Sequence, residues 1–67
     1  MTNESAFFAV RHQHPELVRQ MRLALDVGAN IDHLLQDNQI AQQAYQHMQA
    51  DPSAGVVKWD GMRYTWA

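Results

Sequence analysis

The sequence predicts a mainly α fold with a short N-terminal helix, an antiparallel pair of longer helices and a C-terminal β-hairpin. The helix pair is indicated by apolar residues that recur every three or four positions in two stretches, which Gly28-Ala29-Asn30 separates. The hairpin is indicated by Asp60-Gly61, which lies between two runs rich in aromatic and β-branched residues. A chain of 67 residues has room for a single domain, which we assign to residues 1–67.

The N-terminal helix is expected over residues 4–12, which hold the first apolar cluster of the chain. Asn3 or Ser5 is expected to cap it, because short polar side chains accept hydrogen bonds from the free N–H groups of a first turn. Phe7 is expected to lie in the core. Phe8 points partly away from Phe7 and needs a second surface, which is either the core or a second subunit.

The second helix is expected over residues 15–27. Pro15 suits its first position, where a missing N–H costs nothing, and Gly28 suits the left-handed position that follows its end. The predicted buried stripe consists of Leu17, Val18, Met21, Ala24 and Leu25, widened by Leu23 and Val27. Arg19 and Arg22 lie outside this stripe.

The third helix is expected over residues 31–50, with Asn30 as its cap. Its apolar positions follow a heptad seam made of Ile31, Leu34, Asn38, Ala41, Tyr45 and Met48. Asn38 would then either fix the register or the number of helices in a coiled coil, or lie at the helix edge in water. In the first case Asn38→Leu should keep the helix and change or stabilise the oligomer. The opposite face is rich in glutamine, which forms hydrogen bonds without carrying charge.

The C-terminal hairpin is expected over residues 56–66, with Asp60-Gly61 as a two-residue turn. This turn would place Trp59 opposite Met62 and Val57 opposite Tyr64. One face then carries Val57, Trp59, Met62, Tyr64 and Trp66. We expect Val57, Trp59 and Tyr64 to face the helices, because an isolated hairpin is only marginally stable. The residues that we expect to be available to a partner are Lys58, Met62, Arg63 and Trp66.

The composition limits the partners and the compartment. The net charge is −2 and no block of like charge stands out, which argues against nucleic acid as a partner. No apolar run reaches membrane-spanning length and no signal peptide is apparent, so we expect a soluble, cytoplasmic protein without a membrane partner. The chain is short and has no cysteine, so we expect a homodimer to complete its core. The predicted dimer or core seam comprises Phe8, Ile31, Leu34, Asn38, Tyr45 and Met48.

The residues offer little for catalysis or metal binding. The four histidines, His12, His14, His33 and His47, have a spacing that fits no zinc-site pattern, and the chain lacks cysteine ligands. Neither serine lies in a nucleophile motif, and the three glycines are too scattered to form a phosphate-binding loop. We therefore predict no enzyme activity, no metal and no cofactor.

Two partial resemblances bear on function. Residues 5–19 look like the helix–turn–helix half of an ankyrin repeat, and Gly28-Ala29-Asn30-Ile31-Asp32 is similar to the loop that ends such a repeat. The chain departs from that family in Ser5-Ala6-Phe7-Phe8, which replaces its Thr-Pro-Leu-His turn, and in having one copy only. Covering residues 5–32, this resemblance implies a helix pair and a protein-binding role.

Ala24, Gly28 and Leu34 fall at spacings that resemble a DNA-binding helix-turn-helix, with the hairpin as a wing. Gln36, Gln39 and Gln43 would read adenine edges. Against this, Asp32 and Asp37 lie on the would-be recognition helix, where they would face phosphates.

We therefore expect a small protein–protein interaction module that docks on a larger host protein. In its size and class it looks like the inhibitors and adaptors that phages and mobile elements make. The alternative is a dimeric helix-turn-helix-like DNA-binding regulator.

Overall fold

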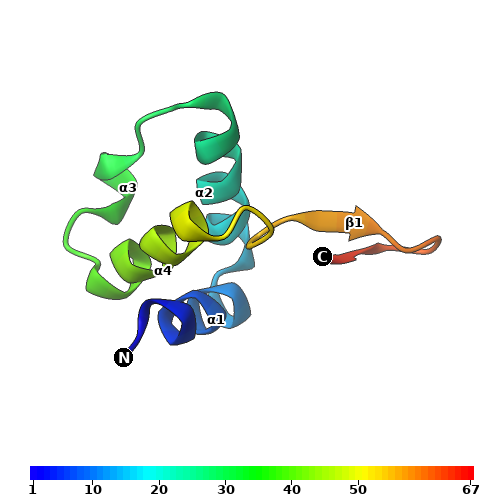
Figure 1. The fold of residues 1–67 in the computed structure, drawn as a ribbon, viewed down its shortest axis with the longest axis horizontal. Helices are drawn as coiled ribbons and strands as arrows, with labels where there is room; N and C mark the ends of the chain where they lie inside the picture. Colours follow the sequence, from blue (N-terminus) through cyan, green and yellow to red (C-terminus); the bar gives the residue numbers. More distant parts are fainter.

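The computed structural model describes all 67 residues and shows four helices followed by a two-stranded antiparallel hairpin (Figure 1). The helices are α1 (Asn3–Gln13), α2 (Pro15–Val27), α3 (Asp32–Leu35) and α4 (Gln39–Ala50). The strands are β1 (Val57–Trp59) and β2 (Tyr64–Trp66). The predicted fold class, mainly α with a C-terminal β-hairpin, is confirmed.

Helix α1 begins one residue earlier than predicted, and its cap is Thr2 rather than Asn3 or Ser5. The Thr2 hydroxyl accepts a hydrogen bond from the Ser5 backbone N–H, and the Ser5 hydroxyl accepts one from the Thr2 N–H, both at 3.0 Å. Asn3 is already helical, and Ser5 contributes as the second member of this reciprocal cap.

Helix α2 follows its prediction at both ends. Pro15 is its first residue, and Gly28 closes it in the left-handed region with φ of 71°. The predicted stripe is buried or half-buried, but Leu23 and Val27 are 62% and 66% exposed. The predicted widening of the stripe is wrong, because these two residues lie on a side of α2 that no other helix covers.

The predicted third helix is broken into α3 and α4. Asp37 adopts a left-handed conformation with φ of 61°, and the Asn38 side chain accepts a hydrogen bond from the Ala41 N–H at 3.0 Å. Asn38 is therefore the N-cap of α4 and not a seam residue. Asn30 does supply an acceptor at the start of α3, because its side chain binds the Asp32 N–H at 2.8 Å.

Because of this break, the predicted heptad seam is not a continuous surface. Ile31 and Met48 lie in the core of the monomer, whereas Phe8 and Leu34 are exposed and Tyr45 is half-buried. Leu34 belongs to α3 and Met48 to α4, so the seam cannot act as one coiled-coil stripe. Self-association stays a prediction, but it needs another surface.

Replacing Asn38 tests this reassignment. We expect Asn38→Leu to lower the free energy of unfolding by about 1 kcal/mol, because α4 loses its cap. This is the opposite of what a buried coiled-coil position would give. Urea unfolding measures the effect, and Asn38→Asp is the matched control, because aspartate is an equally good N-cap. A more stable Asn38→Leu variant would contradict the assignment.

The core is built around small side chains that let the helices approach closely. It consists of Phe7, Val10, Val18, Met21, Ala24, Ile31, Leu35, Ala41, Ala44, Met48 and Ala54. Helix α4 packs more extensively on α1 than on α2, and Ala6, Ala41 and Ala44 are fully buried. At one end of the α1–α4 contact the side-chain amide of Asn3 donates a hydrogen bond to the Gln46 Oε1 at 3.2 Å.

The hairpin projects away from the helices as an arm, which we define as residues 57–66 (Figure 1). Its register pairs Val57 with Trp66 and Trp59 with Tyr64, a shift of two residues from the prediction. The predicted turn is wrong because Asp60 pairs across the hairpin, its N–H donating to the Arg63 carbonyl at 3.0 Å. Gly61 and Met62 therefore form the tip.

Candidate interaction site on the arm

The root of the arm is held by Arg22 of α2. Its guanidinium donates hydrogen bonds to the backbone carbonyls of Ala54, Met48 and Asp51 at 2.8, 3.0 and 2.9 Å. The carbonyls at the end of α4 have no helical partners and carry the negative end of the helix dipole, so a cation suits them. Arg22 thus joins α2, the end of α4 and the connection to the arm. No sequence pattern indicated this role.

Gly55 is the point where the connection touches the helices. It is buried and its φ is +81°, a conformation that residues with a Cβ rarely adopt. A Cβ at this position would lie 2.7 Å from the Met48 Cε and 3.0 Å from the Val18 Cγ1. A glycine is therefore required for the chain to pass this closely over α2 and α4.

Trp66 fixes the other strand of the arm to the helical body. It is half-buried and packs against the core, and the Arg11 guanidinium carbon lies 5.5 Å from the centre of its ring. The same guanidinium lies 4.8 Å from the centre of the Phe8 ring. The prediction that Trp66 is free for a partner is therefore wrong, because Trp66 lies at the root of the arm and not at its tip.

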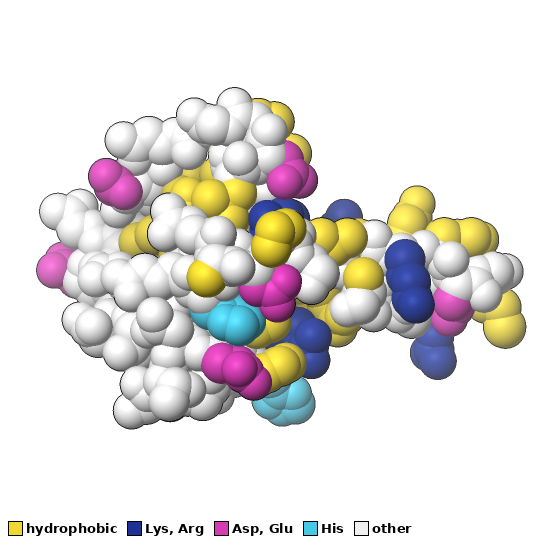
Figure 2. Space-filling model, viewed as in Figure 1, with side chains coloured by type: hydrophobic (Ala, Val, Ile, Leu, Met, Phe, Trp, Pro, Cys, Tyr) yellow, Lys and Arg dark blue, Asp and Glu magenta, His cyan; other side chains and the backbone are white.

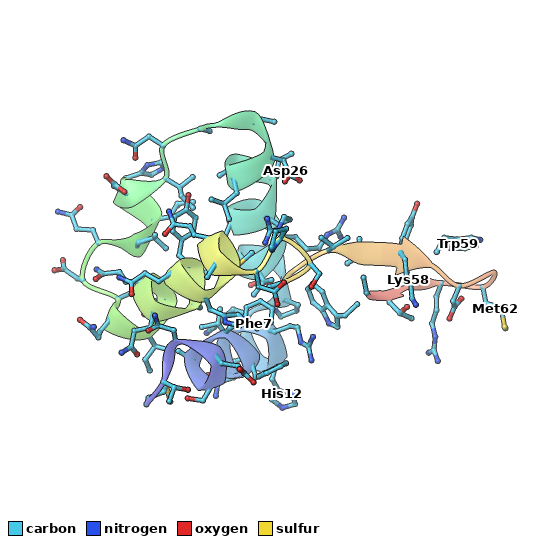
Figure 3. The ribbon with its side chains drawn as sticks, in the orientation of Figure 1. Phe7, His12, Asp26, Lys58, Trp59 and Met62 are labelled. Carbon is cyan, nitrogen blue, oxygen red and sulfur yellow. The ribbon has the colours of Figure 1, made fainter.

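The outer half of the arm exposes three large apolar side chains. Trp59, Tyr64 and Met62 are 58%, 70% and 87% exposed. The rings of Trp59 and Tyr64 pack edge to face with centroids 5.2 Å apart, and Figure 3 shows Trp59 and Met62 far from the helices. The prediction that Trp59 and Tyr64 face the helices is wrong, because the arm extends beyond the helices and carries both side chains with it. Val57, at the root, is half-buried.

Charged groups lie on the face of the arm opposite these aromatic side chains. Lys58 and Arg63 are exposed on the arm, and Figure 2 shows basic and apolar side chains together along it. Backbone N–H groups of Arg63 and Met62 donate to the Asp60 carboxylate and hold the pKa of Asp60 below its usual value. Asp60 therefore closes the tip and is ionised at neutral pH. The arm presents two basic residues and this one carboxylate.

The glutamine-rich face of α4 borders a shallow groove of about 630 Å³ beside α3. Its lining residues are Asp32, His33, Leu35, Gln36, Gln42, Tyr45, Gln46 and Gln49. These side chains are mostly neutral hydrogen-bonding groups. The groove lies on the helices, whereas Trp59 and Met62 lie at the far end of the arm (Figure 3).

The four histidines lie in different surroundings. His12, His14 and His33 are exposed, whereas the His47 ring packs 5.0 Å from the Phe7 ring. The His47 Nε2 also lies 4.0 Å from a carboxylate oxygen of Asp51. No group of three or more histidine, cysteine, aspartate or glutamate side chains is placed to hold a metal ion.

Comparison of the chain with protein-family models, with curated proteins and with solved structures gave no match. Within the structure, no helix has both the length and the apolar character needed to cross a membrane.

Proposed function

We propose that this chain is a protein–protein interaction module that uses the arm to dock on a larger protein. The observation that carries the proposal is the exposed group of Trp59, Met62 and Tyr64 on an arm that extends from the helical body. Aromatic side chains and methionine are enriched in the cores of protein interfaces, and they provide much of the binding energy there.

The way the arm is held favours binding. Arg22 fixes the connection to the arm, and Trp66 packs its second strand against the core. A recognition element whose conformation is set before binding loses less entropy on association. A module of this kind acts by occupying a surface, as an inhibitor does, or by joining two proteins, as an adaptor does.

The charges of the arm indicate the chemistry of the surface it fits. Lys58 and Arg63 lie on the opposite face of the same two-stranded arm, and charges at the periphery of an interface favour a partner of opposite sign. We therefore expect the partner to offer an apolar pocket with acidic residues at its edge. Association should then slow as salt is raised, because rim charges act mainly on the association rate.

The DNA-binding alternative is less well supported by the same geometry. Helix α3 has only four residues, and Asp32 is the first of them. Gln36 lies in the break, so it cannot join Gln39 and Gln43 on one recognition helix. We expect little mobility shift of duplex DNA even at low salt. Specific retention of one duplex at physiological salt would overturn this ranking.

Replacing Trp59 tests the proposed function. We expect Trp59→Ser to weaken partner binding by about 2 kcal/mol, or about thirtyfold in Kd, with little change in thermal stability because Trp59 is largely exposed. Affinity purification of the tagged protein from host cells, followed by titration of the purified partner, measures the loss.

Leu23→Ser is the matched control, because Leu23 is about as exposed as Trp59 but lies on α2. It should leave both the purified partner and the Kd unchanged. Equal binding of the Trp59→Ser variant and the parent would refute the docking role of the arm. Loss of binding in both variants would point to the helical body instead.

A further inference from the structure

The outer edge of β2 has backbone hydrogen-bonding groups without partners. Ala67 donates to the Val56 carbonyl at 2.8 Å and Asp60 to the Arg63 carbonyl at 3.0 Å, so these two pairs are hydrogen-bonded. Hydrogen-bonded and non-hydrogen-bonded pairs alternate along an antiparallel ladder. The Trp59–Tyr64 and Val57–Trp66 pairs are therefore non-hydrogen-bonded, and the N–H and C=O groups of Tyr64 and Trp66 point away from β1.

A two-stranded sheet with three-residue strands is short of stabilising contacts. Hairpins usually need a third strand or a covering helix to be stable in water, and no helix covers the outer half of the arm. A free edge with outward N–H and C=O groups is a template for another strand. An additional strand would therefore stabilise the arm, and the free edge of β2 can pair with one.

We propose that β2 pairs with β2 of a second copy of this chain, antiparallel and with the two-fold axis at Thr65. The outward groups of Tyr64 and Trp66 would then bond to those of Trp66 and Tyr64 in the second copy. The result is a four-stranded sheet in the order β1, β2, β2, β1. This pairing uses the edge of the arm, does not depend on the proposed docking function, and leaves the aromatic face open.

The side chains favour β2 over β1 as the paired edge. Pairing about Thr65 sets Tyr64 opposite Trp66 of the second copy and Thr65 opposite its own equivalent. Aromatic and threonine pairs of this kind stabilise antiparallel sheets. The same pairing of β1 would centre on Lys58 and set two like charges directly opposite each other, which is unfavourable. The paired sheet gathers the Trp59, Tyr64 and Trp66 side chains of both copies on one face.

Cysteine cross-linking tests the pairing directly, because the natural chain has no cysteine. Across the two-fold axis Thr65 would form a non-hydrogen-bonded pair, in which Cα atoms lie about 4.5 Å apart, within the range that a disulfide spans. We expect Thr65→Cys to form a covalent dimer quickly under mild oxidation and Lys58→Cys to form it slowly. Equal rates, or faster cross-linking at Lys58, would overturn the choice of β2.

A charge variant tests the same pairing at equilibrium. In Thr65→Glu the new carboxylate lies opposite Lys58 of its own hairpin, and this pair of opposite charges keeps the hairpin formed. In the dimer the same carboxylate lies opposite the glutamate of the second copy, which is unfavourable. By sedimentation equilibrium, the parent and Thr65→Val should approach twice 7.7 kDa as concentration rises. We expect the dimer Kd of Thr65→Glu to be about fivefold higher or more.

A parent protein that stays monomeric up to about 1 mM would overturn the proposal, because a dimer with a larger Kd would not be a specific complex. A dimer that Thr65→Glu leaves unchanged would also overturn it, because that dimer would use another surface, such as the one around Phe8 or the one around Leu34. Neither outcome concerns Trp59→Ser, so a failure of the pairing is distinguishable from a failure of the docking function.

Discussion

Replacing Arg22 with methionine should lower the free energy of unfolding by roughly 3 kcal/mol. Methionine keeps an unbranched apolar stem but removes every donor. The carbonyls of Met48 and Ala54 then lose their partner, and the Asp51 carbonyl keeps only the Ala54 N–H. A hydrogen bond from a charged donor contributes about 1.5–3 kcal/mol, and these three acceptors are only partly buried. For a chain of this size that loss is a large part of the total stability.

Urea unfolding followed by tryptophan fluorescence measures this loss. Arg22→Lys should lose less, because the ammonium keeps the charge near the end of α4 but cannot reach three carbonyls with a planar fork. Arg19→Met is the control, because the Arg19 side chain is exposed on the same helix and forms no hydrogen bond. If Arg22→Met and Arg19→Met unfold at the same urea concentration, the guanidinium does not hold the arm.

The second large effect is expected at Gly55. Gly55→Val should destabilise the protein by about 2–5 kcal/mol, from two sources that add. A left-handed backbone costs about 1–2 kcal/mol for a residue with a Cβ, and insertion into a well-packed core costs about 1–3 kcal/mol. The second source applies because the new Cβ would meet Met48 and Val18 at 2.7 and 3.0 Å.

Gly28→Val separates these two sources. Gly28 has a similar φ of +71°, but no atom lies within 4 Å of the position its Cβ would take. Gly28→Val should therefore be destabilised only by the cost of the left-handed backbone. Thermal unfolding measures the stability of both variants, and the difference between them is the cost of packing at position 55. Equal destabilisation of the two variants would show that Gly55 is needed for its backbone alone.

The local elements could be read from the sequence because their causes are local. Periodic apolar residues, Pro15 and Gly28 define α2, and two β-prone runs define the hairpin. The break between α3 and α4 was missed because apolar periodicity continues across it. Its cause is that Asn38 binds the backbone of Ala41, and such side-chain hydrogen bonds compete with helix continuation.

The hairpin shows why a partly wrong prediction still placed side chains on the right faces. The Asp60 carboxylate accepts from two backbone N–H groups, which moved the turn forward by one residue and the register by two. Because side chains alternate with a period of two, a shift of two keeps each residue on its predicted face. Trp59 and Tyr64 therefore share a face, as expected.

The direction of the arm could not be read from the sequence. It depends on contacts between residues far apart in the chain, such as Arg22 with Ala54 and Arg11 with Trp66. Trp59 and Trp66 lie on the same face of the hairpin, so only these contacts decide which one is covered. For this reason the predicted exposures of the two tryptophans are reversed: Trp59 is exposed and Trp66 is half-buried.

The hydrogen bonds of Arg22 also bear on how the molecule opens and closes. They join residues 26 to 32 positions apart, so they can form only after α2 and the end of α4 have met. Segments with few buried contacts open at lower free energy than the core, and the arm is such a segment. We infer that the arm is the last part to become ordered and the first to be released. Release of the arm would remove the proposed binding surface while the helices around Ala41 and Ala44 remain folded, so the contacts of Arg22 are what keep that surface formed before binding.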